Sequence, residues 1–390
     1  MSLGRGLWLL LPILLGACAA DDGWLDPDLP AGASAPHLAM TTDGRVVLSY
    51  LAPHEAAGTG LAFTVLDADG WSAPQQVAAG ADWFVNWADF PSVVPVADEL
   101  WAAHWLVRSA EDPYAYDAVV SLSRDGGRTW LPGAPLHGDG TPTEHGFVSL
   151  YPAADGVAAV WLDGRDLHAD PNGAMQLLSA VVRAADGAVL EERPVDDRVC
   201  DCCQTDVAVT TAGPVVVFRD RSAEEIRDIA VSRLTSAGWT PSRIVGADGW
   251  QISGCPVNGP AIAAAGDRVV VGWYTGHPQR HLSVAFSADG AETFSTPVDV
   301  SAGATLGRVD VVLLPGGGAA VSWLSAVPGR LQFRTVAVDG SLGPIQTVAD
   351  VSPERNAGFP QMIRWEQWLV FAWTDVASQR IRARRLPLPL

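Results

Sequence analysis

The stretch VAAVW, residues 157–161, decides the fold because variants of it recur along the whole chain. Seven short apolar runs each end at or near an aromatic residue, at intervals of 50 to 57 residues; these aromatics are Tyr50, Trp105, Trp161, Phe218, Trp273, Trp323 and Trp373. Another short apolar stretch precedes each run, and turn residues and further short stretches follow. Four short strands per repeat, with no helical period, are typical of a propeller blade. We therefore predict an all-β fold, a β-propeller of seven four-stranded blades.

The repeated aromatics and the two chain ends indicate a closed ring. A large residue at the same place in each repeat is what a core shared between neighbouring blades requires, so we interpret most of these aromatics as packing residues. The last repeat ends at RIRARRLPL, residues 380–388, without a fourth strand. We expect the residues just before Pro30 to pair beside it, because this would remove an open sheet edge.

Two turns share a recognisable pattern. SRDGGRTW, residues 123–130, and the looser SADGAETF, residues 287–294, each place an aspartate where its side chain can accept hydrogen bonds from turn amides. The pattern resembles the Asp-box, or BNR repeat, of sialidase-like propellers, here Ser123, Asp125, Gly127, Thr129 and Trp130. The resemblance implies that this turn lies opposite the ligand face. Because sialidases have six blades, it also makes six blades the alternative to seven.

The N-terminus reads as an export signal. Residues 1–17 contain one charged residue, Arg5, followed by an apolar run. The sequence Leu15-Gly16-Ala17-Cys18 resembles the bacterial lipobox. In lipobox proteins the cysteine is acylated with fatty acids such as palmitate. The resemblance implies a lipoprotein with a signal peptide over 1–17, lipidation at Cys18, a tether and possible closing strand over 18–35, and a single propeller domain over 36–390. Ala19 after the cysteine is similar to lipoproteins sorted to the outer membrane. We therefore expect a bacterial cell-envelope protein that contacts the membrane through its lipid anchor only.

Composition excludes several classes of function. The net charge is -19, and all 25 basic residues are arginine. An acidic chain is a poor binder of polyanions, so we expect no nucleic-acid partner. The lack of lysine excludes a lysine Schiff base and a phosphate-loop lysine. We expect a monomer with an unidentified partner, a glycan or a protein.

With Cys18 lipidated, four cysteines remain, namely Cys200, Cys202, Cys203 and Cys255. In an exported protein an even number favours two disulfides, and we expect one of the three clustered cysteines to pair with Cys255. A four-thiolate site for copper or zinc is the first alternative, and a redox pair is the second. Apart from this alternative, we expect no cofactor and no metal.

Function in a propeller belongs to the loops that lead into each blade and those that join its second and third strands, since both sets gather on one face. Blades three and four are unusual there, because their loops carry charged residues beside the cysteines. The predicted binding residues are Asp163, Arg165, Arg219, Asp220 and Arg221. Local ion pairs are the alternative role for these charges.

A sialidase-type active site is the enzymatic alternative. By resemblance it needs three arginines for a carboxylate, a tyrosine nucleophile with a glutamate partner, and an aspartate acid. The candidates for these catalytic roles are Arg165, Arg221, Arg308, Asp163, Asp89, Asp220, Glu144 and Tyr274. The first inner strand, SAPHLAMTT, lacks the arginine that the family places there.

Aromatic and histidine side chains add two smaller expectations. Trp83 and Trp87 either stack on a sugar or pack their loop against its neighbour. The histidines, including His145 and His277, show no ligand spacing, so we interpret them as polar surface. The predicted function is the binding of a ligand or partner on the channel face, with an exo-glycosidase of sialidase type and copper or zinc binding as alternatives.

Overall fold

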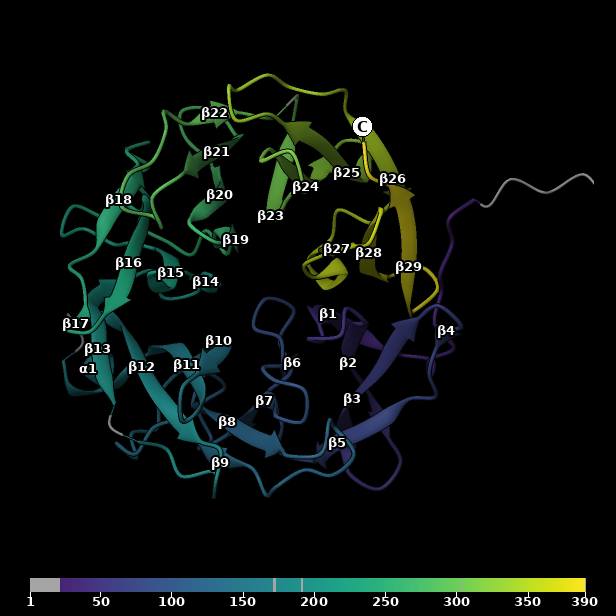
Figure 1. Ribbon diagram of the computed structural model, residues 1–390. Coiled ribbons are helices and arrows are strands. Elements are labelled where there is room, and N and C mark those ends of the chain that lie inside the picture. Colours follow the sequence, from purple (N-terminus) through teal and green to yellow (C-terminus); the bar gives the residue numbers. More distant parts are fainter. Residues whose placement is uncertain (1–21, 171–172, 191, 302, 390) are drawn as a thin grey trace, which may run out of the picture.

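The computed structural model describes residues 22–170, 173–190, 192–301 and 303–389. In this part of the chain, seven antiparallel sheets stand around a ring, as Figure 1 shows. The prediction of an all-β propeller with seven blades is confirmed, so the six-bladed alternative does not apply. The predicted signal peptide, residues 1–17, and the predicted lipidation residue Cys18 lie outside the described residues.

The blades follow one another in chain order, and each begins with its innermost strand. Blade 1 contains β1 (Ser34–Met40), β2 (Val46–His54), β3 (Gly58–Asp67), β4 (Gly70–Trp71) and β5 (Gln75–Gly80), with β4 and β5 both paired to β3. Blade 2 contains β6 (Ser92–Pro95), β7 (Trp101–Arg108), β8 (Tyr116–Ser123) and β9 (Ala134–Pro135). Blade 3 contains β10 (His145–Ala153), β11 (Gly156–Asp163), β12 (Met175–Arg183) and β13 (Arg193–Val199). Blade 4 contains β14 (Asp206–Thr210), β15 (Gly213–Arg219), β16 (Ile229–Thr235), β17 (Gly238–Trp239) and β18 (Arg243–Gly246), with β17 and β18 both paired to β16.

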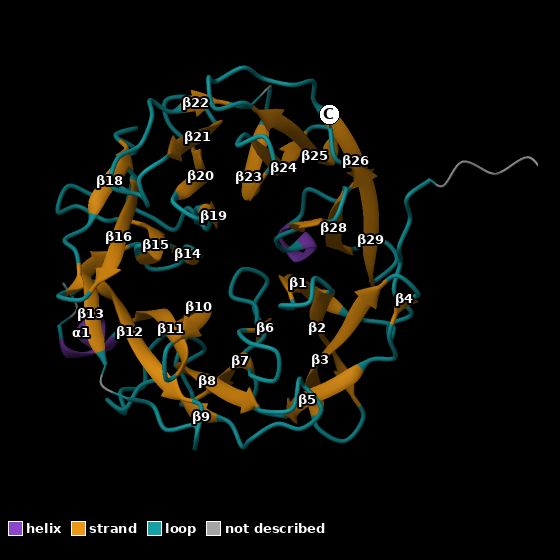
Figure 2. Cartoon of the chain, viewed as in Figure 1, coloured by secondary structure: helices purple, strands orange, loops and turns teal. Residues whose placement is uncertain are grey.

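The remaining blades complete the ring. Blade 5 contains β19 (Ala261–Ala265), β20 (Arg268–Thr275), β21 (His281–Ser287) and β22 (Val298–Asp299). Blade 6 contains β23 (Thr305–Leu313), β24 (Ala319–Ala326), β25 (Gly329–Val336) and β26 (Gln346–Asp350), and blade 7 contains β27 (Gln361–Trp365), β28 (Trp368–Asp375) and β29 (Arg380–Pro387). Two short helical turns interrupt the β structure, α1 (Arg165–Ala169) at the outer edge and the 3-10 helix η1 (Arg355–Ala357) near the centre (Figure 2). Within the described residues, neither turn is long and apolar enough to cross a membrane.

The repeated aromatics lie on the second strand of each blade and pack against the blade before it. Trp161 on β11 belongs to one core cluster with Val120 on β8, and Trp273 on β20 belongs to another with Val231 on β16. All seven aromatics are at most 7% exposed. The prediction that they pack between neighbouring blades is confirmed, and this shared burial is the main force that closes the ring.

Buried aspartates link the innermost strands of neighbouring blades across the channel wall. Asp206 on β14 accepts a hydrogen bond from the backbone N–H of Ile262 on β19 at 2.8 Å. Asp310 on β23 accepts one from the N–H of Met362 on β27 at 2.6 Å. Burial raises the pKa of Asp206 to about 6 and that of Asp310 to about 7, although the backbone hydrogen bonds oppose the shift. Both residues line a channel cavity of about 150 Å³.

The N-terminal segment lies beside the last strand. The backbone N–H of Leu25 donates to the carbonyl of Ala383 on β29 at 3.0 Å. Asp26 pairs with Arg382 at 2.6 Å, and the guanidinium of Arg382 stands 4.3 Å from the centre of the Trp24 ring. Three strands and this segment therefore make up blade 7, which leaves less of the outer edge of β29 exposed.

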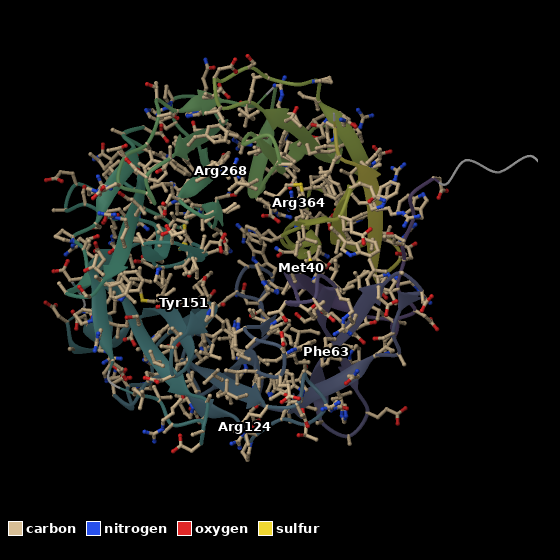
Figure 3. All side chains as sticks on the ribbon, in the orientation of Figure 1. Met40, Phe63, Arg124, Tyr151, Arg268 and Arg364 are labelled. Carbon is tan, nitrogen blue, oxygen red and sulfur yellow. The ribbon has the colours of Figure 1, made fainter. Side chains whose placement is uncertain are left out.

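The turn over residues 123–130 joins β8 and β9 and has the hydrogen bonds that its sequence suggests. Asp125 accepts hydrogen bonds from the backbone N–H and the hydroxyl of Thr129 at 2.8 and 2.6 Å, and Gly127 has a φ of 86°, which favours glycine. Arg124 lies at the outer rim in Figure 3 and donates to the carbonyl of Ala185 in blade 3 at 2.7 Å. Because β8 runs antiparallel to its neighbours, this turn lies at the end of β8 away from the β7–β8 loop.

Candidate functional site

A cavity of about 540 Å³ opens at one face of the ring, at the mouth of the channel. Its lining comes from loops that lead into blades 2, 3, 4, 5 and 7, and from loops that join the second and third strands of blades 2 and 3. These are the two sets of loops that the sequence predicts on the ligand face. We call this space the mouth cavity; its aromatic and charged lining residues include Trp87, Tyr114, Tyr116, Glu144, Asp201 and Arg355.

Aromatic rings form two walls of the mouth cavity. On one side Phe84 stacks on Tyr116 with ring centres 4.1 Å apart, and its edge meets Tyr114 at 6.4 Å. Tyr114 is 58% exposed, so most of its ring is free to contact a ligand. On another side Trp87 stacks on Phe359 at 5.8 Å. Flat aromatic surfaces of this kind bind apolar faces of ligands.

The two tryptophans singled out in the sequence have different roles. Trp87 lines the mouth cavity. Trp83 instead stacks on Trp105 of β7 at 5.5 Å, with ring planes 20° apart, and so packs its loop onto the blade. The loop over residues 81–90 therefore supplies one packing residue and one cavity residue.

Two carboxyl groups with raised pKa values lie near each other, the partly buried Glu144 in the lining of the mouth cavity and the buried Asp89 in the lining of the channel cavity. Burial, together with the negative charges of Asp89 and Asp201, raises the pKa of Glu144 to about 8. Burial raises the pKa of Asp89 to about 7, against a hydrogen bond from the Tyr116 hydroxyl at 3.1 Å. Glu144 thus holds a proton at neutral pH and can donate it. Arg355 stands 6.0 Å from the Trp87 ring, and within the described residues its guanidinium has no hydrogen bond or ion pair.

Asp201 and Arg221 join the cysteine-bearing loop to the charged loop of blade 4. Arg221 pairs with Asp201 at 2.9 Å and with Glu225 at 2.8 Å. The backbone N–H of Cys200 donates to the carbonyl of Arg219 at 2.9 Å, which holds the two loops side by side. The sequence predicts this proximity. The partners of Arg221 fit the ion-pair alternative for this residue.

Arg219 supports the loops from inside the blade. It is 2% exposed and donates to the carbonyls of Asn258, Arg227 and Tyr274, at 2.6 to 3.0 Å. Its guanidinium also lies 4.9 Å from the centre of the Trp250 ring. These four hydrogen bonds fix the backbone, and Arg219 is not among the residues that line the mouth cavity.

Asp220, another predicted binding residue, sits among acidic neighbours. Burial raises its pKa to about 6, with a further contribution from the charges of Asp196 and Asp228. Its backbone N–H donates to the carbonyl of Asp228 at 2.9 Å. Asp220 is not among the residues that line the mouth cavity.

Asp163 and Arg165 form a buried pair in blade 3. Two nitrogens of Arg165 reach the two carboxylate oxygens of Asp163, each at 2.7 Å, and Trp161 donates to the same carboxylate at 2.9 Å. Arg165 also pairs with Glu192 at 2.9 Å. Burial opposes ionisation of Asp163, but the Arg165 hydrogen bonds outweigh it and keep its pKa below the ordinary value.

Beside this pair lies a cluster that sequence reasoning missed, which we call the histidine cluster; it contains Asp117, His137, Asp139, His145 and Asp163. The rings of His137 and His145 stack with centres 3.5 Å apart and planes 7° apart. His145 is fully buried, so its interpretation as polar surface is wrong. No regular spacing connects these residues, because they come from the ends of β8, β10 and β11 and from the loop between β9 and β10.

The ligand atoms of the histidine cluster are close enough together to hold a metal ion, but the two imidazole rings are not oriented to bind one. Asp117 Oδ1 lies 3.5 Å from His137 Nε2 and 3.8 Å from His145 Nδ1, separations that a shared ion could span. An imidazole binds a metal in its own ring plane, however, and two nearly parallel planes have no common point between the rings. One ion cannot therefore bind both histidines without rotating a buried ring.

The three arginines proposed for a sialidase-like triad do not form a common group. Arg165 is paired in blade 3 and Arg221 in blade 4. Arg308 is buried above the Trp87 ring at 5.1 Å and donates to the carbonyls of Gly358 and Glu354, at 2.8 and 3.0 Å. It thus holds the loop that carries η1. Among the described residues, Arg355 is the one arginine that lines the mouth cavity.

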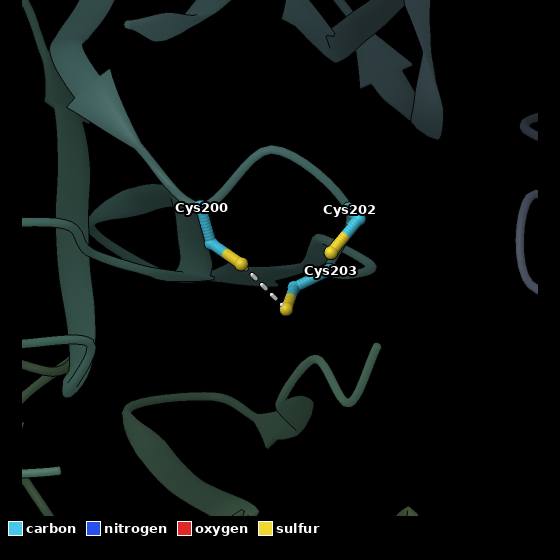
Figure 4. A group of neighbouring side chains, drawn as sticks. All are labelled: Cys200, Cys202 and Cys203. Carbon is cyan, nitrogen blue, oxygen red and sulfur yellow. Dashed lines mark hydrogen bonds between the residues drawn. The ribbon is translucent and has the colours of Figure 1, made fainter. Parts of the chain in front are cut away.

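The four remaining cysteines converge in space. Sγ atoms of Cys200, Cys202 and Cys203 lie within 4.8 Å of one another, and those of Cys200 and Cys203 are 2.7 Å apart (Figure 4). Cys202 lies beside Cys255, which comes from the loop leading into blade 5. All four are free thiols in the structure, so the predicted disulfides stay a prediction. Cys202 and Cys255 also line the mouth cavity.

Comparison with solved structures places the fold among known propellers. A protein of unknown function from Dyadobacter fermentans is 14% identical, with 94% of this chain and 98% of that chain covered and a TM-score of 0.54. An α-L-arabinofuranosidase from Fusarium graminearum is 11% identical, with 94% and 97% covered and a TM-score of 0.51. A NanB sialidase from Streptococcus pneumoniae is 11% identical, with 94% and 71% covered and a TM-score of 0.47. Such likeness concerns the fold alone. The sequence matches no protein-family model and no curated protein.

Proposed function

We propose that this propeller binds a carbohydrate in the mouth cavity. The observation that carries the proposal is the lining itself, in which the exposed ring of Tyr114 and the ring of Trp87 stand beside carboxyl groups. Sugars bind where an aromatic ring contacts their C–H faces and polar side chains hydrogen-bond their hydroxyls. The arabinofuranosidase of the same fold acts on sugars, and this analogy of fold agrees with the proposal.

The charge of the cavity narrows the class of sugar. Of the three carboxyl groups that line it, Glu144 keeps its proton at neutral pH and Asp201 is paired with Arg221, which leaves Asp112 against the single guanidinium of Arg355. A sialidase-type site would need several arginines around one carboxylate, which this lining does not offer. A neutral or amino sugar therefore fits better than an acidic one. The overall charge of -19 further disfavours an anionic glycan.

Tyr114 offers a direct test by titration calorimetry against neutral, amino and acidic oligosaccharides. Tyr114→Ala removes an exposed ring that contributes little to the core, so the fold should survive. We expect the Kd of the best sugar to rise about tenfold, which corresponds to about 1.4 kcal/mol. Val85→Ala is the matched control, because Val85 is 53% exposed in a neighbouring loop and does not line the cavity. If Tyr114→Ala and Val85→Ala bind the sugar with equal affinity, the ligand does not contact Tyr114 and binds outside the mouth cavity.

Hydrolysis of the bound sugar is a second candidate function. Glu144 favours it, since a carboxyl group that keeps its proton at neutral pH is suited to protonate a leaving oxygen. Glu144→Gln should then abolish turnover of an aryl glycoside while binding persists. If no glycoside is turned over by the wild type, the cavity is a binding site only.

We further propose that lipidation of Cys18 holds the ring at the outer membrane. The described chain begins at residue 22, beside β29 at the rim of the propeller. A lipid attached a few residues earlier would tether the ring by its edge. This placement would leave the mouth cavity open to large glycans.

A further inference from the structure

We propose that Cys200, Cys202, Cys203 and Cys255 form a thiolate site for a soft d10 metal ion, Cu(I) or Zn(II). We call these four residues the thiol cluster. Three of them come from the loop between β13 and β14 (Figure 4), and the fourth, Cys255, comes from the loop between β18 and β19. The inference does not depend on the binding of a sugar in the mouth cavity.

The sulfurs converge on one another instead of separating into two isolated pairs. Cys202 lies beside Cys255 as well as beside Cys200 and Cys203, so one sulfur connects the two cysteine-bearing loops. A zinc ion bound to sulfur at about 2.3 Å requires sulfur–sulfur distances of about 3.8 Å in a tetrahedron. The three sulfurs of the β13–β14 loop are within 4.8 Å of one another, and Cys200 and Cys203 need to move apart from 2.7 Å.

The backbone that carries the thiol cluster is fixed before any metal binds. Gln204, next to Cys203, donates from its side chain to the carbonyl of Ala88 in the loop leading into blade 2, at 2.6 Å. Its side-chain oxygen accepts from the backbone N–H of Gly259, beyond Cys255, at 3.0 Å. One side chain thus connects both cysteine-bearing loops to the ring. Such preorganisation lowers the cost of assembling a metal site.

Buried positive charge beside the sulfurs favours thiolates. Arg227 is 2% exposed and places Nη1 3.4 Å from Cys200 Sγ. Arg219, also 2% exposed, acts electrostatically on Cys200 and Cys203. Metals bind thiolates, and Arg227 lies close enough to stabilise one at Cys200 in addition to its ion pair with Glu225 at 2.8 Å.

The donor set selects the kind of ion. All four donors are sulfur, and the nearest carboxylate in sequence, Asp201, is already paired with Arg221 at 2.9 Å. Soft donors without oxygen ligands favour Cu(I) and Zn(II) over magnesium or calcium. Three sulfurs from one loop suit trigonal Cu(I), whereas Zn(II) needs Cys255 as the fourth ligand. The contribution of Cys255 therefore distinguishes the two ions.

The test begins with the full chain, exported by a bacterial host and purified without oxygen. Metal content and free thiols are measured in denaturant with a chelator, with and without prior reduction. We expect close to one equivalent of copper or zinc and no gain of thiols on reduction. A metal-free protein that gains two or four thiols on reduction would overturn the proposal and establish disulfide staples instead.

Titration of metal-free, reduced protein then identifies the ligands. Cu(I) is added against a copper chelator and Zn(II) against a zinc chelator, with Co(II) absorption as a report of thiolate coordination. Cys202→Ser should weaken both ions by about 100-fold or more, since loss of a ligand costs at least as much as loss of an outer-shell partner. Cys255→Ser should weaken Zn(II) equally and leave Cu(I) almost unchanged.

Ser253→Ala is the matched control, because Ser253 is exposed in the same loop as Cys255 and has no sulfur. Circular dichroism shows whether each variant folds. Cys255 is exposed, so its variant remains informative even if a variant of the buried Cys200 or Cys203 fails to fold. If wild type and Cys202→Ser bind both ions with equal affinity, the thiol cluster is not a metal site.

Discussion

Arg165→Met should destabilise the protein substantially, because it leaves the carboxylate of Asp163 buried without its charge partner. Asp163 is fully buried, and Arg165 satisfies both of its oxygens at 2.7 Å. Removal of one partner of a buried ion pair typically costs about 3 to 5 kcal/mol. Trp161 still donates to the carboxylate at 2.9 Å, and Arg165 is itself 25% exposed. The expected loss in free energy of unfolding is therefore near the lower end, about 3 kcal/mol.

Urea unfolding followed by tryptophan fluorescence measures this loss. Asp163→Asn should cost less, because Arg165 keeps Glu192 at 2.9 Å and part of its guanidinium reaches water. Arg183→Met is the control, since Arg183 pairs with Asp186 at the same 2.7 Å but on the open surface, where no measurable change is expected. If Arg165→Met and Arg183→Met unfold at the same urea concentration, Arg165 has no structural role. Arg165 would then again be a candidate for ligand binding.

Three further outcomes are expected. Asp310 keeps a proton up to a pKa of about 7 in the folded protein, whereas the unfolded chain releases it near 3.8, so stability should fall as pH rises through this window. Asp310→Asn should remove about 1.4 kcal/mol per pH unit from that slope in urea titrations between these values, and an unchanged slope would contradict the raised pKa. Trp24→Ala removes the ring under Arg382 and should lower the melting temperature, while no change would show that the N-terminal segment adds no stability. Cys18→Ser should release the protein into the soluble fraction after cell lysis, and retention with membranes would refute the anchor.

The fold could be predicted because its determinants repeat. One aromatic residue recurs in each blade, at intervals of 50 to 57 residues. Because seven repeats indicate the same buried position, a wrong assignment of one strand hardly affects the predicted fold. The position of each aromatic also identifies the second strand, and the loops after it then follow. Blade 3 shows the limit of this reasoning, since a five-residue helix, α1, forms within the charged loop, from Arg165 onward, and has no counterpart in the sequence pattern.

The sequence indicated which loops lie side by side, but not which of their side chains line the mouth cavity. The cysteine loop and Arg221 are neighbours, as their positions in consecutive repeats suggest. Arg219 and Arg308 look similar to Arg221 in sequence, but both are buried and donate to backbone carbonyls. Whether an arginine side chain contacts a ligand or a backbone carbonyl depends on which loops of other blades lie beside it, and the sequence of one repeat does not show this. The histidine cluster was missed for the same reason, since residues of two blades share it without any common spacing.

Charge alone therefore does not locate function in this ring, because two of the arginines predicted to bind a ligand already pair with carboxylates. Arg165 is bound by Asp163 and Arg221 by Glu225, so a ligand would have to break a buried or half-buried pair to reach either arginine. A ligand that binds to a group without a hydrogen-bond or ion-pair partner does not have to break an existing interaction. Within the described residues, the Glu144 carboxyl has no hydrogen-bond partner, and it faces the mouth cavity with the Tyr114 ring and the thiol of Cys255. We therefore expect a ligand to bind in the mouth cavity and a metal ion to bind at the thiol cluster in its wall, because these groups can still form further bonds.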